Sequence, residues 1–196
     1  MHFPVPAEVS SVAQNLRIEG FEAYLVGGCV RDLIIGRKPK DWDITTNAKP
    51  EDIQRIFPDS YYTNDFGTVG VLRETEDETL KVIEVTPYRT ESGYTDKRRP
   101  DKVEFGQSLE EDLARRDFTI NAIAYDESKG QVVDPYKGQD DLRGKVLRTV
   151  GNPLERFEED GLRLMRAVRL VAELNFALDG ETASSIKEKA ENLSHI

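Results

Sequence analysis

The segment Tyr24–Ile44, with the sequence YLVGGCVRDLIIGRKPKDWDI, constrains the fold more than any other part of the chain. Its apolar start completes a predicted buried strand over residues 21–26, and a short helix is predicted over residues 30–35. Gly27 and Gly28 turn the chain from the strand into the helix. Such a turn leaves backbone N–H groups free to approach an anion, and the helix dipole favours negative charge there. The segment therefore predicts a strand–turn–helix unit that can bind a phosphate.

A pair of carboxylates follows this unit. Asp41 and Asp43 are two positions apart on a predicted strand, so both side chains point to the same face. Trp42 and Ile44 then pack on the opposite face. Adjacent carboxylates repel unless a cation lies between them, and oxygen-only ligands favour magnesium or manganese. Alone, an Asp-x-Asp triplet can equally be an inert surface feature; with the glycine turn and Arg31, it indicates nucleotidyl transfer.

A third acidic residue lies within an apolar strand. Glu84 is flanked by β-branched residues in segment 79–86, which is predicted to form an antiparallel hairpin with residues 68–74. A carboxylate in such a strand costs desolvation energy unless it has a partner. Two interpretations stay open at this point. Glu84 meets the acidic pair through a metal, or it is an edge-strand residue that faces water.

Capping residues and apolar spacing predict the helices. Ser108 and Glu111 form a capping box, and Asn152 precedes Pro153 at another helix start. The predicted helices cover residues 9–16, 49–57, 108–116, 153–175 and 179–193.

Two longer segments carry information about organisation. Residues 89–102 have no apolar periodicity, so we expect a long mobile loop there. Strands give way to helices near residue 150. This change predicts one domain over residues 1–150 and the start of a helical domain over residues 151–196.

Composition restricts the partners and the compartment. The net charge of −10 opposes tight binding to a polyanion, so contact with nucleic acid must be local or must use other parts of a longer protein. No apolar run approaches the roughly 18 residues that a membrane span needs, and no secretory signal is visible. Cys29 is the only cysteine, which excludes an intramolecular disulfide. We therefore expect a cytoplasmic protein without a membrane or disulfide partner.

Four ordered motifs resemble those of class II tRNA nucleotidyltransferases and bacterial poly(A) polymerases, a family of the DNA polymerase β superfamily. They are GGCVRD…DWDI (27–44), RRDFTINA (115–122), DPYKGQDDL (134–142) and EDGLRLMRAVR (159–169). The resemblance covers nearly the whole chain. It implies an α+β fold: a nucleotidyltransferase head with a mixed, mainly antiparallel sheet and flanking helices, followed by an all-α neck. The chain has Gly161 where the family usually has Pro or Ala.

The resemblance also implies roles for the matching residues. Asp41 and Asp43 would hold two magnesium ions, for which manganese can substitute, and Glu84 is a further catalytic candidate. Asp160 and Arg163 would recognise the base. The implied nucleotide-binding residues are Gly27, Gly28, Arg31, Asp32, Arg116, Asp117, Asp160, Arg163, Arg166 and Arg169. On the predicted helix the last three arginines recur every third residue and form one basic stripe.

Two polar residues in these motifs receive a structural interpretation. Asn121 and Asp134 are predicted to satisfy backbone groups at a turn or a helix end. Phe118, like Trp42, is predicted to belong to the core.

The implied reaction is template-independent transfer of CMP or AMP from CTP or ATP to a tRNA 3′ end, as CCA or A addition. Poly(A) synthesis is the alternative within the family. A small-molecule nucleotidyltransferase would not need the second and fourth motifs, and a non-catalytic binding module would be expected to have lost Asp41 or Asp43. In the family, most tRNA contact comes from helices beyond the last motif, so we expect weak tRNA binding by this chain.

Overall fold

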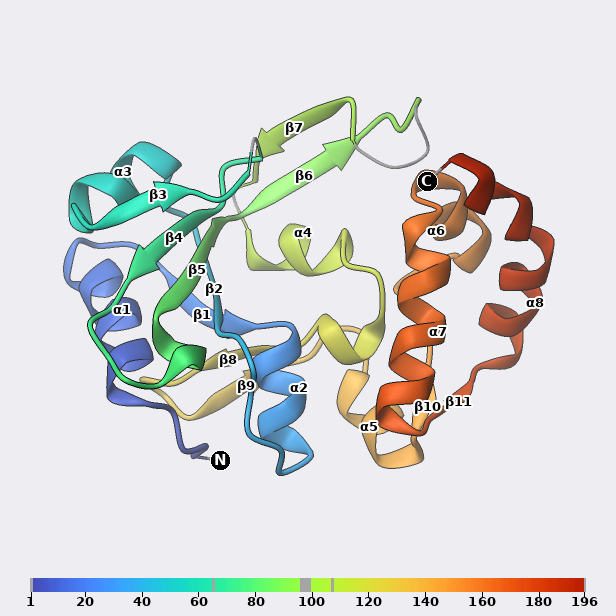
Figure 1. Ribbon diagram of the computed structural model, residues 1–196, viewed down its shortest axis with the longest axis horizontal. Helices are drawn as coiled ribbons and strands as arrows, with labels where there is room; N and C mark the ends of the chain where they lie inside the picture. Colours follow the sequence, from blue (N-terminus) through green and yellow to red (C-terminus); the bar gives the residue numbers. More distant parts are fainter. Residues whose placement is uncertain (1, 65, 96–99, 107, 196) are drawn as a thin grey trace.

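A mixed sheet lies at the centre of the fold (Figure 1). The structure is a computed structural model that describes residues 2–64, 66–95, 100–106 and 108–195. Within these residues the sheet has seven strands, in the order β3 (Ser60–Tyr62), β4 (Val69–Leu72), β5 (Val82–Pro87), β2 (Asp43–Thr46), β1 (Ala23–Val26), β8 (Ala124–Asp126) and β9 (Gln131–Val133). All neighbouring strands are antiparallel except β2 and β5, which are parallel. The predicted α+β class and mainly antiparallel sheet are confirmed.

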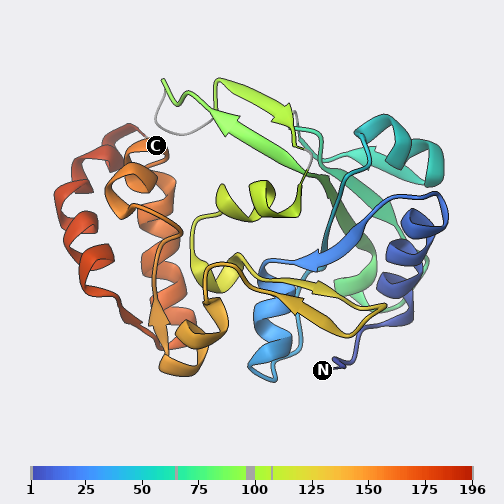
Figure 2. The ribbon, with the colours of Figure 1, turned by 180° about the vertical axis from the view of Figure 1, so that it is seen from behind.

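Helices accompany the sheet and also form a separate group at the C-terminal end (Figures 1 and 2). Those with the sheet are α1 (Ala7–Ile18), α2 (Gly28–Ile34), α3 (Pro50–Ile56), η1 (Glu78–Leu80), α4 (Leu109–Ala114) and η2 (Thr119–Asn121). α5 (Gly138–Gly144) lies beside η2 and β10, next to the C-terminal group. The C-terminal group contains α6 (Pro153–Glu159), α7 (Leu162–Leu174), α8 (Gly180–Glu188) and η3 (Ala190–His195). A short parallel ladder joins β10 (Val146–Leu147) to β11 (Ala177–Leu178). In both views α7 is the helix of this group nearest the sheet.

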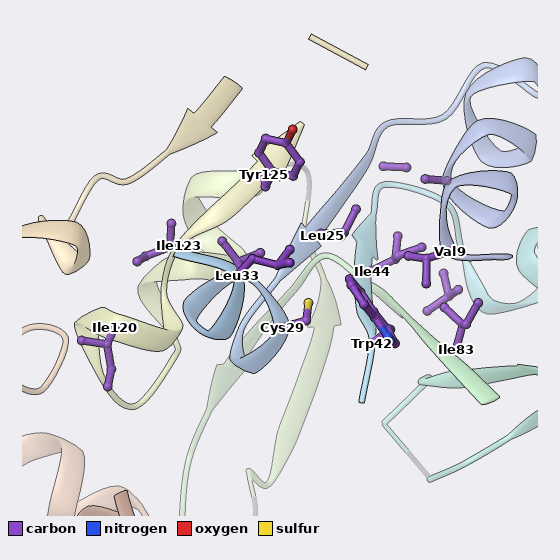
Figure 3. Packing of buried hydrophobic residues seen from close by; sticks show 14 of the residues in the cluster. Val9, Leu25, Cys29, Leu33, Trp42, Ile44, Ile83, Ile120, Ile123 and Tyr125 are labelled. Atoms are coloured by element: carbon purple, nitrogen blue, oxygen red, sulfur yellow. The ribbon is translucent and has the colours of Figure 1, made fainter. Parts of the chain in front are cut away.

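The main hydrophobic core lies between the sheet and its helices (Figure 3), and the same cluster continues into the C-terminal group through Phe157 of α6 and Leu164 and Leu170 of α7. α1 buries the apolar residues whose spacing predicts it: Val9, Val12, Ala13 and Leu16. Trp42 and Ile44 are buried as predicted, and Phe118 belongs to the same cluster. Cys29 is a buried free thiol. In the described part of the chain, no helix combines the length and the apolar character that crossing a membrane requires.

Local capping predictions are confirmed. The Ser108 hydroxyl accepts a hydrogen bond from the backbone N–H of Glu111, and Asn152 caps α6 in the same way. Asp134 accepts from the first two backbone N–H groups of α5, so its structural interpretation is correct. The predicted hairpin of residues 68–74 and 79–86 is the antiparallel pair β4 and β5.

The prediction of a long loop over residues 89–102 is wrong at both ends, whereas the described residues 93–95 and 100–101 lie in no helix or strand. β6 (Arg89–Ser92) pairs with β7 (Lys102–Phe105) in an antiparallel hairpin. Apolar periodicity is absent because ion pairs hold β6 in place: Glu91 accepts hydrogen bonds from two arginine side chains. Residues 96–99, at the centre of the expected loop, lie outside the described residues.

The single helix predicted over residues 153–175 is two helices. Asp160 adopts an extended conformation between α6 and α7, and its side chain accepts a hydrogen bond from the backbone N–H of Leu162. Gly161 therefore lies at a helix start rather than in a helix interior. A Cβ atom at Gly161 would lie 2.7 Å from the carbonyl oxygen of Asn192, so the close approach of η3 requires glycine here.

Candidate active site

The glycine turn forms one wall of the site. Gly27 follows β1 with a φ of +79°, a left-handed conformation that side chains other than glycine rarely adopt. A Cβ atom there would lie 3.3 Å from Arg116 Nη1 and 3.5 Å from Asp43 Oδ2. A Cβ atom at Gly28 would face Arg31 and Asp41. The two glycines therefore allow cationic and anionic side chains to approach the start of α2 together.

Asp41 and Asp43 lie beside this turn at the start of β2. Asp41 is exposed, whereas Asp43 is partly buried. Burial raises the pKa of Asp43 to about 7, and the negative charges of Asp41 and Glu84 add to the increase, while Arg116 opposes it. The fold therefore keeps the two carboxylates close together despite their mutual repulsion. A bound cation would relieve this repulsion.

Glu84 occupies the position opposite Asp43 in the parallel β2–β5 pair. β5 lies between β4 and β2, so the interpretation of Glu84 as an edge-strand residue is wrong, although its side chain is exposed. Although the side chain is exposed as a whole, partial desolvation of its carboxyl group raises the pKa of Glu84, and the charge of Asp41 raises it further. The parallel pairing is the feature that brings this third carboxylate to the acidic pair.

Two adjoining cavities bring the other candidates together. The Arg116 cavity, of about 340 Å³, contains among its lining residues Gly27, Gly28, Asp43, Arg116, Asp117, Asp160, Arg163 and Arg166. The Arg31 cavity, of about 310 Å³, contains Gly28, Arg31, Asp32, Asp41, Asp43, Arg166 and Arg169. Four residues line both cavities: Gly28, Asp43, Asn121 and Arg166. Thus every predicted site residue except Glu84 lines at least one of them.

A line of hydrogen bonds crosses the boundary between the cavities. Arg31 donates to Asp32 and, through Nη1, to Asn121 Oδ1 at 3.0 Å. Asn121 Nδ2 in turn lies 3.4 Å from Asp117 Oδ1, and Asp117 Oδ2 accepts from Arg166. The interpretation of Asn121 as a residue that satisfies backbone groups is therefore wrong, because its side chain connects two charged residues of the site.

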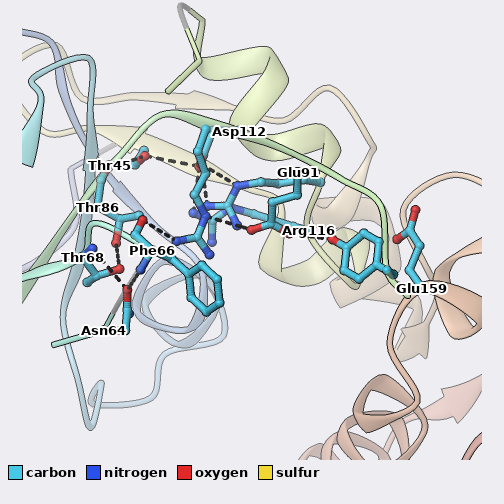
Figure 4. Close-up of polar contacts among 12 residues, drawn as sticks. Thr45, Asn64, Phe66, Thr68, Thr86, Glu91, Asp112, Arg116 and Glu159 are labelled. Carbon is cyan, nitrogen blue, oxygen red and sulfur yellow. Dashed lines mark hydrogen bonds and ion pairs between the residues drawn. The ribbon is translucent and has the colours of Figure 1, made fainter. Parts of the chain in front are cut away.

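Asp112 holds Arg115 and Arg116 beside the site (Figure 4). Its carboxylate is fully buried and accepts from Arg116 Nη2 at 2.9 Å and from Arg115 Nη2 at 2.6 Å. Burial alone would raise the pKa of Asp112, but Arg116 and Arg115 outweigh burial and lower it. Both arginines are thereby held as cations at the edge of the Arg116 cavity.

The arginines of α7 form a row along the two cavities. Arg163 is buried, pairs with Glu159 and lies 5.9 Å from the centroid of the Tyr94 ring. Arg166 pairs with Asp117, and Arg169 is exposed. The spacing predicts this row correctly, but it is not a uniform basic stripe, because acidic partners neutralise its first two members.

Comparison with protein families identifies the family of this chain. Residues 23–148, which contain the glycine turn, the acidic pair and Arg116, match the family described as the Poly A polymerase head domain. The chain belongs to this family. Among relatives of the head-domain family, the CCA-adding enzyme of Geobacillus stearothermophilus is 48% identical over 190 residues, a match that covers 96% of this chain and 46% of that protein. That of Lactobacillus helveticus is 50% identical over 186 residues, covering 94% and 45% respectively.

Solved structures of similar proteins agree with the sequence relatives. The Bacillus stearothermophilus CCA-adding enzyme in complex with CTP has a TM-score of 0.86 and 44% identity, and the match covers 98% of this chain and 46% of that one. A tRNA nucleotidyltransferase complexed with a primer tRNA and an incoming ATP analog has a TM-score of 0.72 and 31% identity, and the match covers 92% of this chain and 50% of that one. The chain thus spans about half the length of the relatives it matches.

The sequence patterns do not single out several residues that line the two cavities: Arg89, Glu91, Arg115, Lys40 and Glu173. Alternate residues of a strand share a face, so Arg89 and Glu91 could have been paired had residues 89–92 been interpreted as a strand. Arg115 adjoins Arg116 in the second motif. Lys40 Nζ and Glu173 Oε1 form an ion pair at 3.3 Å. No signal in the sequence connects these two residues.

Proposed function

We propose that this chain is the catalytic head and the first neck helices, residues 1–150 and 151–196, of a template-independent RNA nucleotidyltransferase. The enzyme adds CMP and AMP from CTP and ATP to the 3′ end of tRNA in the cytoplasm, as CCA or A addition. The observation that carries the proposal is the convergence of Asp41 and Asp43 with the arginines of α7 on two cavities that share residues. The names of the relatives, CCA-adding enzymes, support the same reaction.

The donor set at the acidic pair fits magnesium, with manganese as a substitute. Asp41 and Asp43 supply only carboxylate oxygens, the ligands that both ions prefer. In the described part of the chain no three His, Cys, Asp or Glu side chains converge on one point, so triphosphate oxygens and water would complete each coordination sphere. Bound magnesium supplies neutralisation of the triphosphate and acidifies the attacking 3′-hydroxyl. Glu84, opposite Asp43 in the β2–β5 pair, is the third catalytic candidate; it adds negative charge beside the acidic pair rather than a third metal ligand.

The triphosphate is bound by the glycine turn and the arginines. Gly27 and Gly28 let the phosphates approach the N–H groups at the start of α2. Arg116 supports this role, since its buried Nε has no hydrogen-bond partner among the described residues. Arg31, Arg166 and Arg169 line the adjoining cavity, and the other candidates orient them: Asp32 holds Arg31, and Asp117 holds Arg166.

Asp160 and Arg163, which line the Arg116 cavity, select the base of the incoming nucleotide. A carboxylate accepts from an exocyclic amino group, which cytosine carries at N4 and adenine at N6, and a guanidinium donates to the neighbouring ring nitrogen or carbonyl. Uracil and guanine present a carbonyl oxygen where the amino group should be. A bidentate contact of this kind discriminates by about 1–3 kcal/mol.

Binding of the four nucleoside triphosphates with magnesium tests the proposal. The chain should bind CTP and ATP about tenfold or more tightly than UTP and GTP. Asp160→Asn keeps an oxygen that can accept from the Leu162 N–H but adds an N–H donor that can meet the carbonyl oxygen of uracil or guanine. It should therefore reduce the preference for CTP and ATP over UTP and GTP. Asp134→Asn, the same change at the cap of α5, should leave it unaltered. Equal affinity of the unsubstituted chain for all four nucleotides would contradict the proposal.

The product needs a second measurement, made on the full-length enzyme. Transfer of CMP and then AMP to a tRNA that lacks its 3′ end would support CCA addition. Transfer of AMP alone to a tRNA ending in CC would support A addition, and repeated AMP transfer to any RNA would identify a poly(A) polymerase.

A further inference from the structure

Asp112 takes no part in the proposed chemistry, yet it is among the most enclosed charges of the molecule. Its side chain has no solvent exposure. The two carboxylate oxygens have different partners. Oδ1 accepts from Nε and Nη2 of Arg115, whereas Oδ2 accepts from Arg116 Nη2 and from the Thr45 hydroxyl, at 2.9 and 3.2 Å. Thr45 lies on β2 two residues after Asp43, so Asp112 connects α4 to the strand that carries the acidic pair.

The contact with Asp112 uses one edge of the Arg116 guanidinium and leaves the other edge at the site. Arg116 Nη1 and Asp43 Oδ2 lie 3.3 and 3.5 Å from one point, the position where Gly27 would carry Cβ. A cation so close to Asp43 has an alternative, which is to pair with Asp43 directly. That pairing would occupy the oxygen that a divalent ion needs and would withdraw the guanidinium from the phosphates.

We propose that Asp112 is a positioning residue that fixes Arg116 beside the glycine turn before nucleotide arrives and keeps Arg116 from pairing with Asp43. The inference rests on the proposed function, since it assigns Arg116 to the triphosphate. Pre-orientation of this kind reduces the entropic cost of binding, because the guanidinium needs no reordering when the phosphates enter.

A double-mutant cycle on CTP binding in magnesium tests the inference with Asp112→Asn, Arg116→Gln and the double variant. Asp112→Asn should weaken CTP binding by about ten- to a hundredfold, the effect of a lost charge-assisted hydrogen bond. In the Arg116→Gln background the same change should add nothing, because Asp112 acts through Arg116. Losses that multiply, or an Asp112→Asn chain that binds CTP within twofold of the original, would overturn the inference.

Thr45→Val is the matched control. It removes another hydrogen bond to the same Asp112 oxygen from a fully buried position but leaves the ion pair with Arg116. It should lower the melting temperature without changing CTP affinity; a parallel loss of affinity would show that Asp112 acts only through stability. If the original chain binds no CTP, the proposed function itself fails.

Nitrogen NMR of the unsubstituted chain tests the same point if Asp112→Asn does not fold. The Arg116 guanidinium should already rotate slowly and exchange slowly with water before CTP is added. A guanidinium that becomes ordered only with CTP would overturn the inference.

Discussion

Arg166 of α7 is held by Asp117, a residue 49 positions earlier in the chain: its Nε and Nη2 atoms both lie 2.6 Å from Asp117 Oδ2. Burial alone would raise the pKa of Asp117, but the Arg166 charge and hydrogen bonds outweigh burial and lower it. This ion pair joins the second motif, which follows α4, to the helix that carries the row of arginines.

Replacement of Asp117 by Asn should destabilise the chain by roughly 1–2 kcal/mol at pH 7, less than for a fully buried pair, because the Arg166 side chain is 41% exposed. A pKa lowered below the ordinary 3.8 contributes stability above about pH 4, and this contribution disappears as pH falls through the folded-state pKa. Urea unfolding should therefore show a difference between the variant and the original that shrinks towards pH 3. A difference independent of pH would contradict this.

Replacement of Asp43 by Asn should preserve or increase stability without metal. The pKa of Asp43 is raised from 3.8 to about 7, so the folded state retains a proton that the unfolded state has lost, and stability from this group falls as pH rises between those values. The melting temperature of the variant in EDTA should exceed that of the original by more at pH 8 than at pH 5. A variant that melts lower at pH 8 would refute this.

Metal binding should follow the same titration. A divalent ion competes with the proton on Asp43, so manganese should bind more tightly as pH rises from 6 to 8. Electron paramagnetic resonance of free manganese measures this directly. Asp43→Asn should bind manganese weakly at both values and without the pH dependence.

Replacement of Gly27 by Ala should cost about 1–2 kcal/mol of stability from the left-handed backbone and should also abolish CTP binding. Gly36 is the matched control: its φ is +72°, but a Cβ atom there would meet nothing within 4 Å. Gly36→Ala should cost similar stability and leave CTP binding intact. Equal loss of binding in both variants would mean that the Gly27 effect is not local to the site.

Replacement of Gly161 by Ala, a residue usual in the family at this position, should destabilise this chain by about 1–3 kcal/mol, because the added methyl group would lie 2.7 Å from the Asn192 carbonyl oxygen. Thermal unfolding beside Gly180→Ala provides the comparison. Gly180 is also near a helix start but has open space, so that variant should be neutral or more stable. A neutral Gly161→Ala would show that η3 moves easily.

The sequence predicts those parts of the fold that local rules determine. α1 follows from the spacing of Val9 to Leu16, and the helix starts follow from Ser108 and Asn152. Long-range charge pairing is not visible in the same way. β6 lacks apolar alternation because Glu91 is held by arginines, one of them Arg115 at the C-terminal end of α4. The need for glycine at position 161 comes from the approach of a segment about 30 residues later.

The same distinction between local and long-range features applies to the candidate site. Each motif residue could be named because its type and spacing fit phosphate or metal chemistry, whereas the contacts between motifs could not. The sequence predicts that Asn121 satisfies backbone groups, because its partner Arg31 belongs to another motif; its second partner, Asp117, lies four residues earlier in its own motif. Only the folded chain shows that it lies between them.

The pair of Asp117 and Arg166 also bears on the order of events during synthesis. A ribosome releases every strand of the main sheet, and Asp117 with them, before it releases Arg166. Until α7 emerges, Asp117 must stay exposed or take up a proton if it is to be buried. A nascent chain that ends near residue 150 should therefore resist proteases poorly. We therefore expect the sheet and the arginine helix to become stable together, once Arg166 can pair with Asp117.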